Sequence, residues 1–345
     1  MGHVSTILNG LMRRRRRAKQ DCDRNGRDAA DRMARDARKN EVVLRSSGTL
    51  NSASVFSKRG DKPTNQDRCI VWEDFGCQRD MIFCGIFDGH GPWGHFVANQ
   101  VREAMPSSLL STWQHTLIAQ ASSDKNKLHH FNIWKHSYLK TCAAIDKELQ
   151  HNGSIDAFYS GTTALTIVKQ GDDIFIANVG DCRAVLGTYS ESESSGSKLV
   201  AEQLTIDMKP NLPQEAARIS ECNGRVYSMD DECGVPRLWL PHEESPGLAI
   251  SRAFGDYCAK DFGLISVPHI THRRITTHDH FIVLATDGVW DVISNEEAVE
   301  IVVGTEREKS GKRLVECAAR AWKRKRKGIA MDDISAIVLF LHSNF

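Results

Sequence analysis

The sequence predicts an α+β protein, in which strands and helices occupy separate parts of the chain. Short apolar runs rich in β-branched and aromatic residues recur along it, and Gly, Asn and Asp bound them. Longer segments with apolar residues at helical spacing do not alternate regularly with these runs. With 345 residues, of which 41% are hydrophobic, the chain can form one large domain or two small ones.

The individual elements follow from the period of the apolar residues. Pro213 and Gly224 mark the start and end of one short helix, and no internal repeat stands out. Residues 190–197 are a low-complexity Ser/Glu segment that we expect to be a surface loop. We expect strands over 54–60, 68–73, 81–87, 162–168, 173–179, 184–186, 281–286 and 334–341, and helices over 95–111, 131–150, 213–223, 295–303 and 311–327.

The first 48 residues differ in composition from the rest and are expected to be a basic, disordered extension. Residues 1–40 carry 12 Lys and Arg against 5 Asp, a net charge of +7. Since the whole chain carries +1, the remainder carries −6. Strand patterning begins only near residue 50, which places a catalytic domain at 49–345.

Cysteine usage indicates an intracellular protein. The ten Cys are scattered, form no C-x-x-C pair, and several fall in apolar runs, so we expect them to be reduced. No apolar run approaches the roughly 20 residues needed to cross a bilayer.

Three acidic positions adjoin apolar strands in a way that favours a shared site. Asp88 and Asp287 each follow a strand-like run and precede a Gly, whereas Asp332 comes just before one. A single Asp-Gly after a strand is usually only a turn. In an antiparallel sheet, however, the end of one strand lies beside the start of the next, so the three acids are expected to meet at one sheet edge.

Carboxylates that meet in this way need positive charge between them. Because no Cys or His cluster accompanies them, the donors are oxygens, which suits Mg²⁺ or Mn²⁺ better than Zn²⁺. Gly89 is expected to allow a sharp turn and to bring its carbonyl close to whatever Asp88 holds.

Seven motifs in order resemble the metal-dependent protein phosphatase family, type 2C, and above all its plant members. The resemblance covers about residues 50–343. The motifs are Asn65-Gln-Asp67, Phe87-Asp-Gly-His-Gly91, Ser160-Gly-Thr-Thr163, Asn178-Val-Gly-Asp-Cys-Arg183, Ala249-Ile-Ser-Arg-Ala-Phe-Gly-Asp256, Thr286-Asp-Gly-Val-Trp-Asp291 and Asp332-Asp-Ile-Ser335.

The resemblance implies a four-layer αββα sandwich of two antiparallel sheets, and hydrolysis of phosphoserine and phosphothreonine in proteins with two Mg²⁺ or Mn²⁺ ions. Asp88 would bridge both ions, with the Gly89 carbonyl on one of them. Asp287 and Asp332 would hold the other ion. By the same resemblance, Asp67 would orient a metal-bound water and His90 would be the general acid. Asp181 and Asp291 would hold a third, weaker ion.

Two positions depart from the family pattern. Lys62 stands where many relatives carry Arg, so it would contact phosphate as a point charge without a bidentate fork. Gln66 aligns with a Glu that contacts a metal-bound water, so affinity for that ion is expected to be lower. Neither change removes a direct ligand.

The leading hypothesis is an active serine/threonine phosphatase that works as a monomer. One alternative is a pseudophosphatase that serves as a binding module; the presence of Asp88, Asp287 and Asp332 speaks against it. Another is nucleic-acid binding through Arg13–Arg17 and Lys323–Lys327, which no recognisable nucleic-acid module supports. The substrate is not specified by the sequence, and Trp239 is either a packed aromatic or an exposed lip of the cleft, with packing favoured.

The extreme N-terminus suggests a membrane location. Met1-Gly2-His-Val-Ser-Thr6 fits the N-myristoylation pattern M-G-x-x-x-[ST], and Arg13–Arg17 follows within a few residues. A single myristoyl chain binds membranes only marginally, but a polybasic segment supplies the second signal that stable anchoring needs. We therefore expect the cytoplasmic face of the plasma membrane, with the nucleus or cytosol as the alternative.

Overall fold

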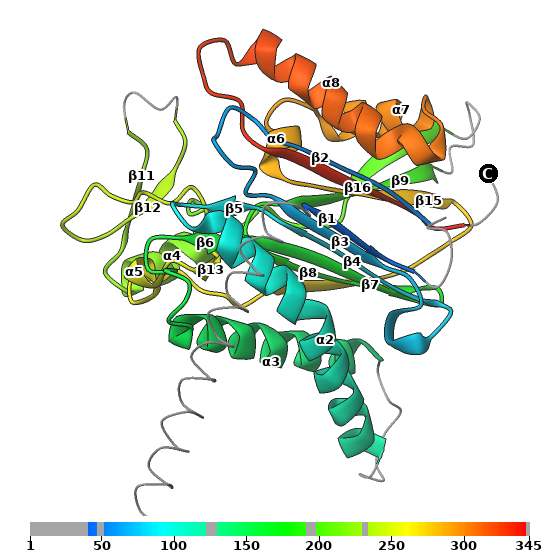
Figure 1. Ribbon diagram of the computed structural model, residues 1–345, viewed down its shortest axis with the longest axis horizontal. Helices are drawn as coiled ribbons and strands as arrows, with labels where there is room; N and C mark the ends of the chain where they lie inside the picture. Colours follow the sequence, from blue (N-terminus) through cyan, green and yellow to red (C-terminus); the bar gives the residue numbers. More distant parts are fainter. Residues whose placement is uncertain (1–40, 47–51, 122–129, 191–197, 230–233, 343–345) are drawn as a thin grey trace, which may run out of the picture. The chain divides into compact units, whose positions relative to one another are not determined.

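The computed structural model describes residues 41–46, 52–121, 130–190, 198–229 and 234–342. These residues belong to one compact unit, Glu41–Phe345, shown in Figure 1. The expected disorder of residues 1–40 and the loop at 191–197 lie outside the described residues. No helix in the described part of the chain is long and apolar enough to span a bilayer.

The first sheet has six strands in the order β1-β3-β4-β7-β8-β14. All neighbours are antiparallel except β1 and β3, which are parallel. The strands are β1 (Val42–Arg45), β3 (Arg68–Trp72), β4 (Met81–Phe87), β7 (Ala164–Gln170), β8 (Asp173–Val179) and β14 (His269–Arg274).

The second sheet has five strands in the order β10-β9-β15-β16-β2 and is antiparallel throughout. Its strands are β2 (Ala53–Lys58), β9 (Arg183–Ser190), β10 (Lys198–Gln203), β15 (Asp279–Ala285) and β16 (Ile334–Phe340). The chain enters this sheet through β2 between β1 and β3, and that excursion provides the long crossover which the parallel β1–β3 pair requires.

Helices cover the outer face of each sheet (Figure 1). On the first sheet lie α2 (Gly94–Ala121) and α3 (His130–His151). On the second lie α6 (Asp287–Trp290), α7 (Asn295–Val303) and α8 (Ser310–Lys325). A capping box, in which Ser294 and Glu297 bond each other's backbone N–H, fixes the start of α7. Two short 3₁₀ helices, η1 (Phe75–Cys77) and η2 (Arg307–Lys309), complete these layers.

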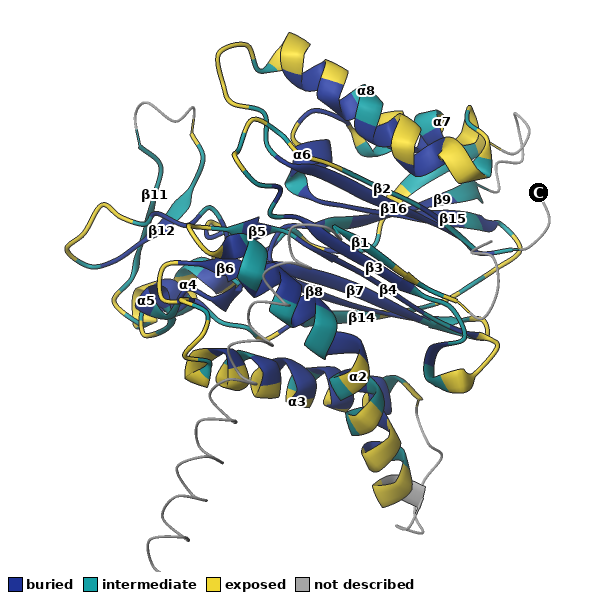
Figure 2. Ribbon diagram, in the orientation of Figure 1, coloured by how far each residue is buried: buried dark blue, intermediate teal, exposed yellow. Residues whose placement is uncertain are grey.

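Alternation along β15 shows why the layers form. Ile282 and Leu284 join the buried cluster between the two sheets, whereas Phe281, Val283 and Ala285 pack under α7 and α8. Side chains on a strand point to opposite faces in turn, so a strand that is apolar on both faces must be covered on both. Figure 2 shows both sheets buried between outer helices whose far sides are exposed. The four-layer αββα sandwich is thus confirmed.

A smaller lobe adjoins one end of the sandwich. Its elements are β5 (Gly89–His90), β6 (Gly161–Thr162), α4 (Pro213–Glu221), β11 (Arg225–Tyr227), β12 (Arg237–Trp239), β13 (Phe254–Gly255) and α5 (Tyr257–Lys260). Trp239 is 3% exposed and its ring stacks on Tyr227 at 5.2 Å, so the interpretation of Trp239 as a packed aromatic is confirmed.

Some elements differ from the prediction. No strand was expected before about residue 50, and this is wrong, because β1 pairs with β3 within the stretch assigned to the extension. The description of both sheets as antiparallel is wrong for this one pair. Strands β10 and β14 were not predicted; β14 reads His269-Ile-Thr-His-Arg-Arg274 and lies at a sheet edge, where one strand flank lacks a partner and polar residues are common. The eight Cys in the described residues are free, as expected.

Candidate active site

Four of the predicted site aspartates lie at the same end of the two facing sheets. In the first sheet, Asp88 directly follows β4 and Asp67 directly precedes the neighbouring β3. In the second sheet, Asp287 follows β15 by two residues and Asp332 precedes β16 by two residues. Since both strand pairs are antiparallel, the end of one strand lies beside the start of the other.

Hydrogen bonds connect the two sheets at this end. The Thr286 hydroxyl donates to Oδ2 of Asp67 at 3.0 Å. Asp333 accepts from the backbone N–H of Gln66 at 2.8 Å and of Gly60 at 2.9 Å. The expectation that the acids share one sheet edge is therefore wrong in detail: they come from two sheets, and the sandwich packing brings the two ends together.

The carboxylates interact unfavourably with one another. Burial and the neighbouring Asp67 and Asp287 raise the pKa of Asp88 well above its usual range. Burial and Asp181 do the same for the pKa of Asp287. The pKa of the fully buried Asp67 is raised to about 7 by burial and by Asp333. The cluster therefore has more negative charge than the surrounding protein balances.

Two lysines supply part of the missing positive charge. Lys62 forms an ion pair with Asp332, and Lys209 forms one with Asp181. Burial alone would lower the pKa of each lysine, but the adjacent carboxylates raise it overall. Lys62 thus contacts a predicted metal ligand directly, in the position where the sequence predicted a phosphate contact.

The residues present fit hard divalent cations. Oδ1 of Asp67 and Oδ1 of Asp287 are buried and have no hydrogen-bond partner in the described part of the chain. Such oxygens are costly unless a partner is supplied. Within the described residues, no three His, Cys, Asp or Glu side chains already form a group that could hold a metal ion.

Gly89 is required for space and not for a turn. It lies in β5 with an ordinary backbone conformation, and the positive φ in this loop, 81°, belongs to Gly91. A Cβ on Gly89 would lie 2.5 Å from the Gly94 carbonyl oxygen and 2.8 Å from that of Gln66. The Gln66 amide donates to the Gly91 carbonyl at 2.7 Å, so it serves to hold this loop.

His90 is held by an aspartate that the sequence analysis gave no role. Its Nε2 lies 2.6 Å from Oδ2 of Asp256, which is 1% exposed, while the His90 side chain is 26% exposed. Burial would lower the pKa of His90, but the charge of Asp256 and its hydrogen bond raise it overall. The sequence does contain a signal for this contact, because Asp256 is the last residue of the motif 249–256. The pairing could not be predicted, because Asp256 lies 166 positions from His90 in the chain.

Asp181 and Asp291 occupy different environments beside this cluster. Asp181 is buried and paired with Lys209, and Asp291 is exposed and lies 3.4 Å from Arg326. Both influence the pKa of Asp287, which places them near it.

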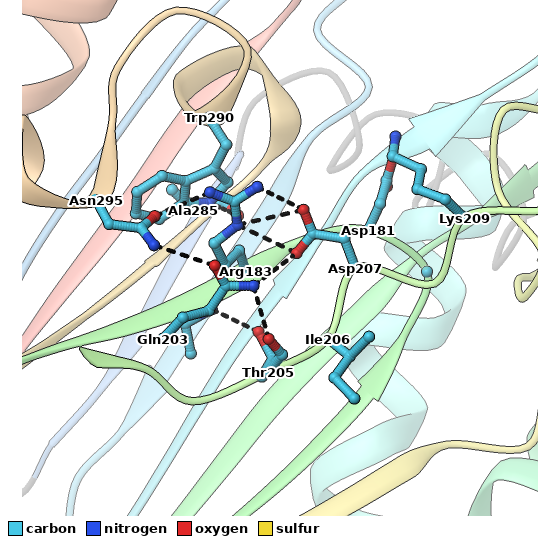
Figure 3. Close-up of polar contacts among 12 residues, drawn as sticks. Asp181, Arg183, Gln203, Thr205, Ile206, Asp207, Lys209, Ala285, Trp290 and Asn295 are labelled. Atoms are coloured by element: carbon cyan, nitrogen blue, oxygen red, sulfur yellow. Dashed lines mark hydrogen bonds and ion pairs between the residues drawn. The ribbon is translucent and has the colours of Figure 1, made fainter. Parts of the chain in front are cut away.

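A polar network around Arg183 fixes the segment that carries Lys209 (Figure 3). The Arg183 guanidinium donates to both carboxylate oxygens of Asp207 and, at 2.9 Å, to Oδ1 of Asn295. It also lies over the Trp290 ring, 5.2 Å from its centroid. Strand β9, the 205–209 loop and the α6–α7 region are thereby connected directly behind the acidic cluster.

This architecture, an αββα sandwich with an acidic cluster at one end of its two sheets, matches a known class of enzyme. The family model "Protein phosphatase 2C" matches residues 51–332. "Probable protein phosphatase 2C 34" of Arabidopsis thaliana is 60% identical, with 100% of this chain and 98% of that protein covered. "Probable protein phosphatase 2C 48" of Oryza sativa subsp. japonica is 55% identical, with 99% of each covered.

Among solved structures, the serine-threonine phosphatase 2C from Toxoplasma gondii aligns with a TM-score of 0.72 and 25% identity, covering 85% of this chain and 96% of that one. The chain belongs to the protein phosphatase 2C family, as a plant-type member. It is therefore a metal-dependent protein serine/threonine phosphatase, and its substrates are phosphoproteins. Nothing in these comparisons supports the pseudophosphatase alternative.

Proposed function

We propose that the acidic cluster holds two Mg²⁺ or Mn²⁺ ions, with Asp88 shared between them and Asp287 and Asp332 completing one side. The Gly89 carbonyl and, for a third and weaker ion, Asp181 and Asp291 are the further candidate ligands. Two buried carboxylate oxygens without partners and the raised pKa values of Asp88 and Asp287 support this assignment. Bound ions would lower the pKa of water and offset the charge that develops on the phosphoryl group.

The chain's own residues then have separate tasks. Asp67, with one oxygen held by Thr286 and the other free, is placed to accept a hydrogen bond from the attacking water. Lys62 lies beside Asp332 and can contact a phosphate oxygen as a point charge. His90, whose pKa is raised by the charge and hydrogen bond of Asp256, would give a proton to the departing serine or threonine oxygen.

The metal requirement has a direct test. Phosphate release from a phosphothreonine peptide should require added Mn²⁺ or Mg²⁺ and stop with EDTA. The melting temperature should also rise with Mn²⁺, because an ion that binds only the folded state stabilises it. Turnover that continues unchanged in EDTA, or a melting temperature indifferent to Mn²⁺, would refute the metal assignment.

We also propose that the phosphatase acts as a monomer at the cytoplasmic face of the plasma membrane. Gly2 within the myristoylation pattern and Arg13–Arg17 support membrane attachment.

Replacing Gly2 with Ala should release the protein from the plasma membrane, because N-myristoylation of the α-amino group requires glycine at this position. Imaging of wild type and Gly2→Ala with a C-terminal fluorescent tag measures this. Replacing Arg13–Arg17 with Gln, which keeps Gly2, should weaken residence but not abolish acylation. If wild type and Gly2→Ala share one distribution, for example nuclear through Arg13–Arg17 or Lys323–Lys327, the lipid anchor is excluded.

A further inference from the structure

A groove of about 550 Å³ runs between α7 and α8 on the outer side of the second sheet. Figure 1 shows the two helices side by side there, and in Figure 2 α8 presents an exposed surface. Arg313, Arg320 and Arg324 line the groove from α8, and Glu297 and Glu300 line it from α7. Its floor is apolar, with Ala321 and Ile293 buried.

The three arginines form one stripe along α8. Their spacing of seven and four residues returns each side chain to nearly the same face of a helix with 3.6 residues per turn. All three are exposed, and none forms an ion pair in the described part of the chain, although the charge of Arg324 contributes to a lowered pKa of Glu297. The Arg320 guanidinium donates to Sγ of Cys317 at 3.1 Å. The stripe spans roughly 16 Å at about 1.5 Å per residue.

A purely structural role does not explain this stripe. Cations stabilise the C-terminal turn of a helix, but Arg313 lies in the first turn of α8, where the helix dipole disfavours positive charge. Other cations of the same helix do have partners: Lys325 pairs with Glu297 at 3.5 Å and Arg326 with Asp291 at 3.4 Å. The groove-lining cations are arginines, whose planar fork suits carboxylate and phosphate groups.

The opposite wall restricts the kind of partner. Glu297 is already engaged by the Ser294 backbone and Lys325, whereas Glu300 has no ion pair among the described residues. A broad anionic surface such as a membrane would meet this acidic wall together with the arginines. An extended peptide fits better, because its successive side chains point to opposite sides, so that acids can face α8 alone.

The C-terminal end of α8 is held against the segment that follows β15. The Trp322 indole N–H donates to the Gly288 carbonyl at 2.7 Å, and the Lys325 ammonium donates to the Val292 carbonyl at 2.6 Å. These bonds fix the C-terminal end of α8, which includes Arg324, against the segment that begins with Asp287. This end of α8 therefore adjoins the loop that carries Asp291, whose carboxylate lies 3.4 Å from Arg326.

We propose that the α7–α8 groove is a docking site for an acidic segment of the substrate phosphoprotein, with Arg313, Arg320 and Arg324 pairing its carboxylates. This inference rests on the proposed phosphatase function. At about 3.3 Å per extended residue, roughly five residues span the stripe. The groove thus selects substrates that carry acids at alternate positions near the phosphorylated residue.

The test compares two triple variants in α8 and the residues directly after it. One replaces Arg313, Arg320 and Arg324 with Gln, and the control replaces Lys312, Lys323 and Lys327, which do not line the groove, with Gln. Both remove three positive charges. The substrates are a phosphothreonine peptide joined by a Gly/Ser spacer to three glutamates that alternate with glutamines, the same peptide with six glutamines, and p-nitrophenyl phosphate. Melting curves confirm that each variant is folded.

We expect the arginine variant to raise KM for the glutamate peptide about tenfold at low salt, as three exposed charge pairs would, with no change for the glutamine peptide or p-nitrophenyl phosphate. The lysine variant should change little. Equal effects of both variants, or no effect of the arginine variant, would overturn the proposal. The proposal would also be overturned if the arginine variant lost only its binding to vesicles that contain 30% phosphatidylserine, because this would indicate that the stripe binds a lipid surface.

A binding measurement separates this proposal from the catalytic one. Fluorescence anisotropy of the unphosphorylated glutamate peptide reports docking without turnover. If the wild type binds this peptide and the arginine variant does not, docking stands even where metal-dependent hydrolysis fails. If hydrolysis proceeds and neither protein binds the peptide more tightly than its glutamine counterpart, docking is wrong and the phosphatase assignment is untouched.

Discussion

Asp88→Asn, Asp287→Asn and Asp332→Asn should each reduce phosphopeptide turnover about 100-fold or more while the protein remains folded. Each change removes a charged oxygen donor from the acidic cluster, and metal stabilisation of a phosphoryl oxygen is worth several kcal/mol in the transition state. Turnover and circular dichroism should be measured on the same preparations.

Stability without metal gives a second readout. The pKa of Asp88 is raised in the folded state, so its charged form opposes folding above the pKa of the unfolded chain. Asp88→Asn removes this repulsion, so the metal-free variant should melt at or above the wild-type temperature, while the Mn²⁺-induced rise should shrink. Asp80→Asn, an exposed acid at the opposite end of β4, is the matched control and should retain both turnover and the Mn²⁺ effect. Normal turnover in folded Asp88→Asn would falsify the metal site.

His90→Ala should slow phosphopeptide hydrolysis by roughly 10²–10⁴-fold and p-nitrophenyl phosphate hydrolysis far less. The reason lies in the leaving group: an alkoxide needs a proton as it departs, whereas nitrophenolate leaves readily without one. The measurement is kcat for both substrates at one pH and saturating Mn²⁺. Equal slowing on both would show that His90 has a structural role or acts on the metal ligands.

The contact between His90 and Asp256 adds a pH dependence to this prediction. Asp256 raises the pKa of His90, so the proton is retained to higher pH than in a free histidine. Asp256→Asn keeps the size of the side chain but removes the charge. The alkaline limb of kcat for phosphopeptides should then move to lower pH, while the p-nitrophenyl phosphate profile keeps its position. If the alkaline limb of the kcat profile does not move, Asp256 has no influence on proton transfer by His90.

The raised pKa of His90 also predicts how the stability of the protein depends on pH. Because the folded-state pKa of His90 is raised, its contact with Asp256 stabilises the protein fully below the unfolded pKa, and this contribution is lost as pH rises through the folded pKa. Asp256→Asn should therefore lower the melting temperature more at pH 6 than at pH 9.

The sequence by itself determined the strands and helices of the sandwich core and the family. The run from Phe281 to Ala285 is apolar throughout, which requires a strand covered on both faces. Helix α7 begins at a capping box formed by Ser294 and Glu297, three residues apart in the sequence. These signals are local: period, caps and turns depend on neighbours within one or two turns of chain. The seven motifs contain the acids that the structure brings together in the cluster.

Only the tertiary structure decided how those acids are supported. The bond from Thr286 to Asp67 joins residues 219 positions apart on different sheets, and Asp256 reaches His90 across 166 positions. The sequences of β1 and of edge strand β14 show only weak strand patterns. These segments form strands because they pair with the edge of a sheet. The arginine stripe of α8 could be read as a solvated helix face until α7 was placed beside it. Long-range contacts of this kind arise from the packing of two sheets and their helices, and no local period in the sequence encodes them.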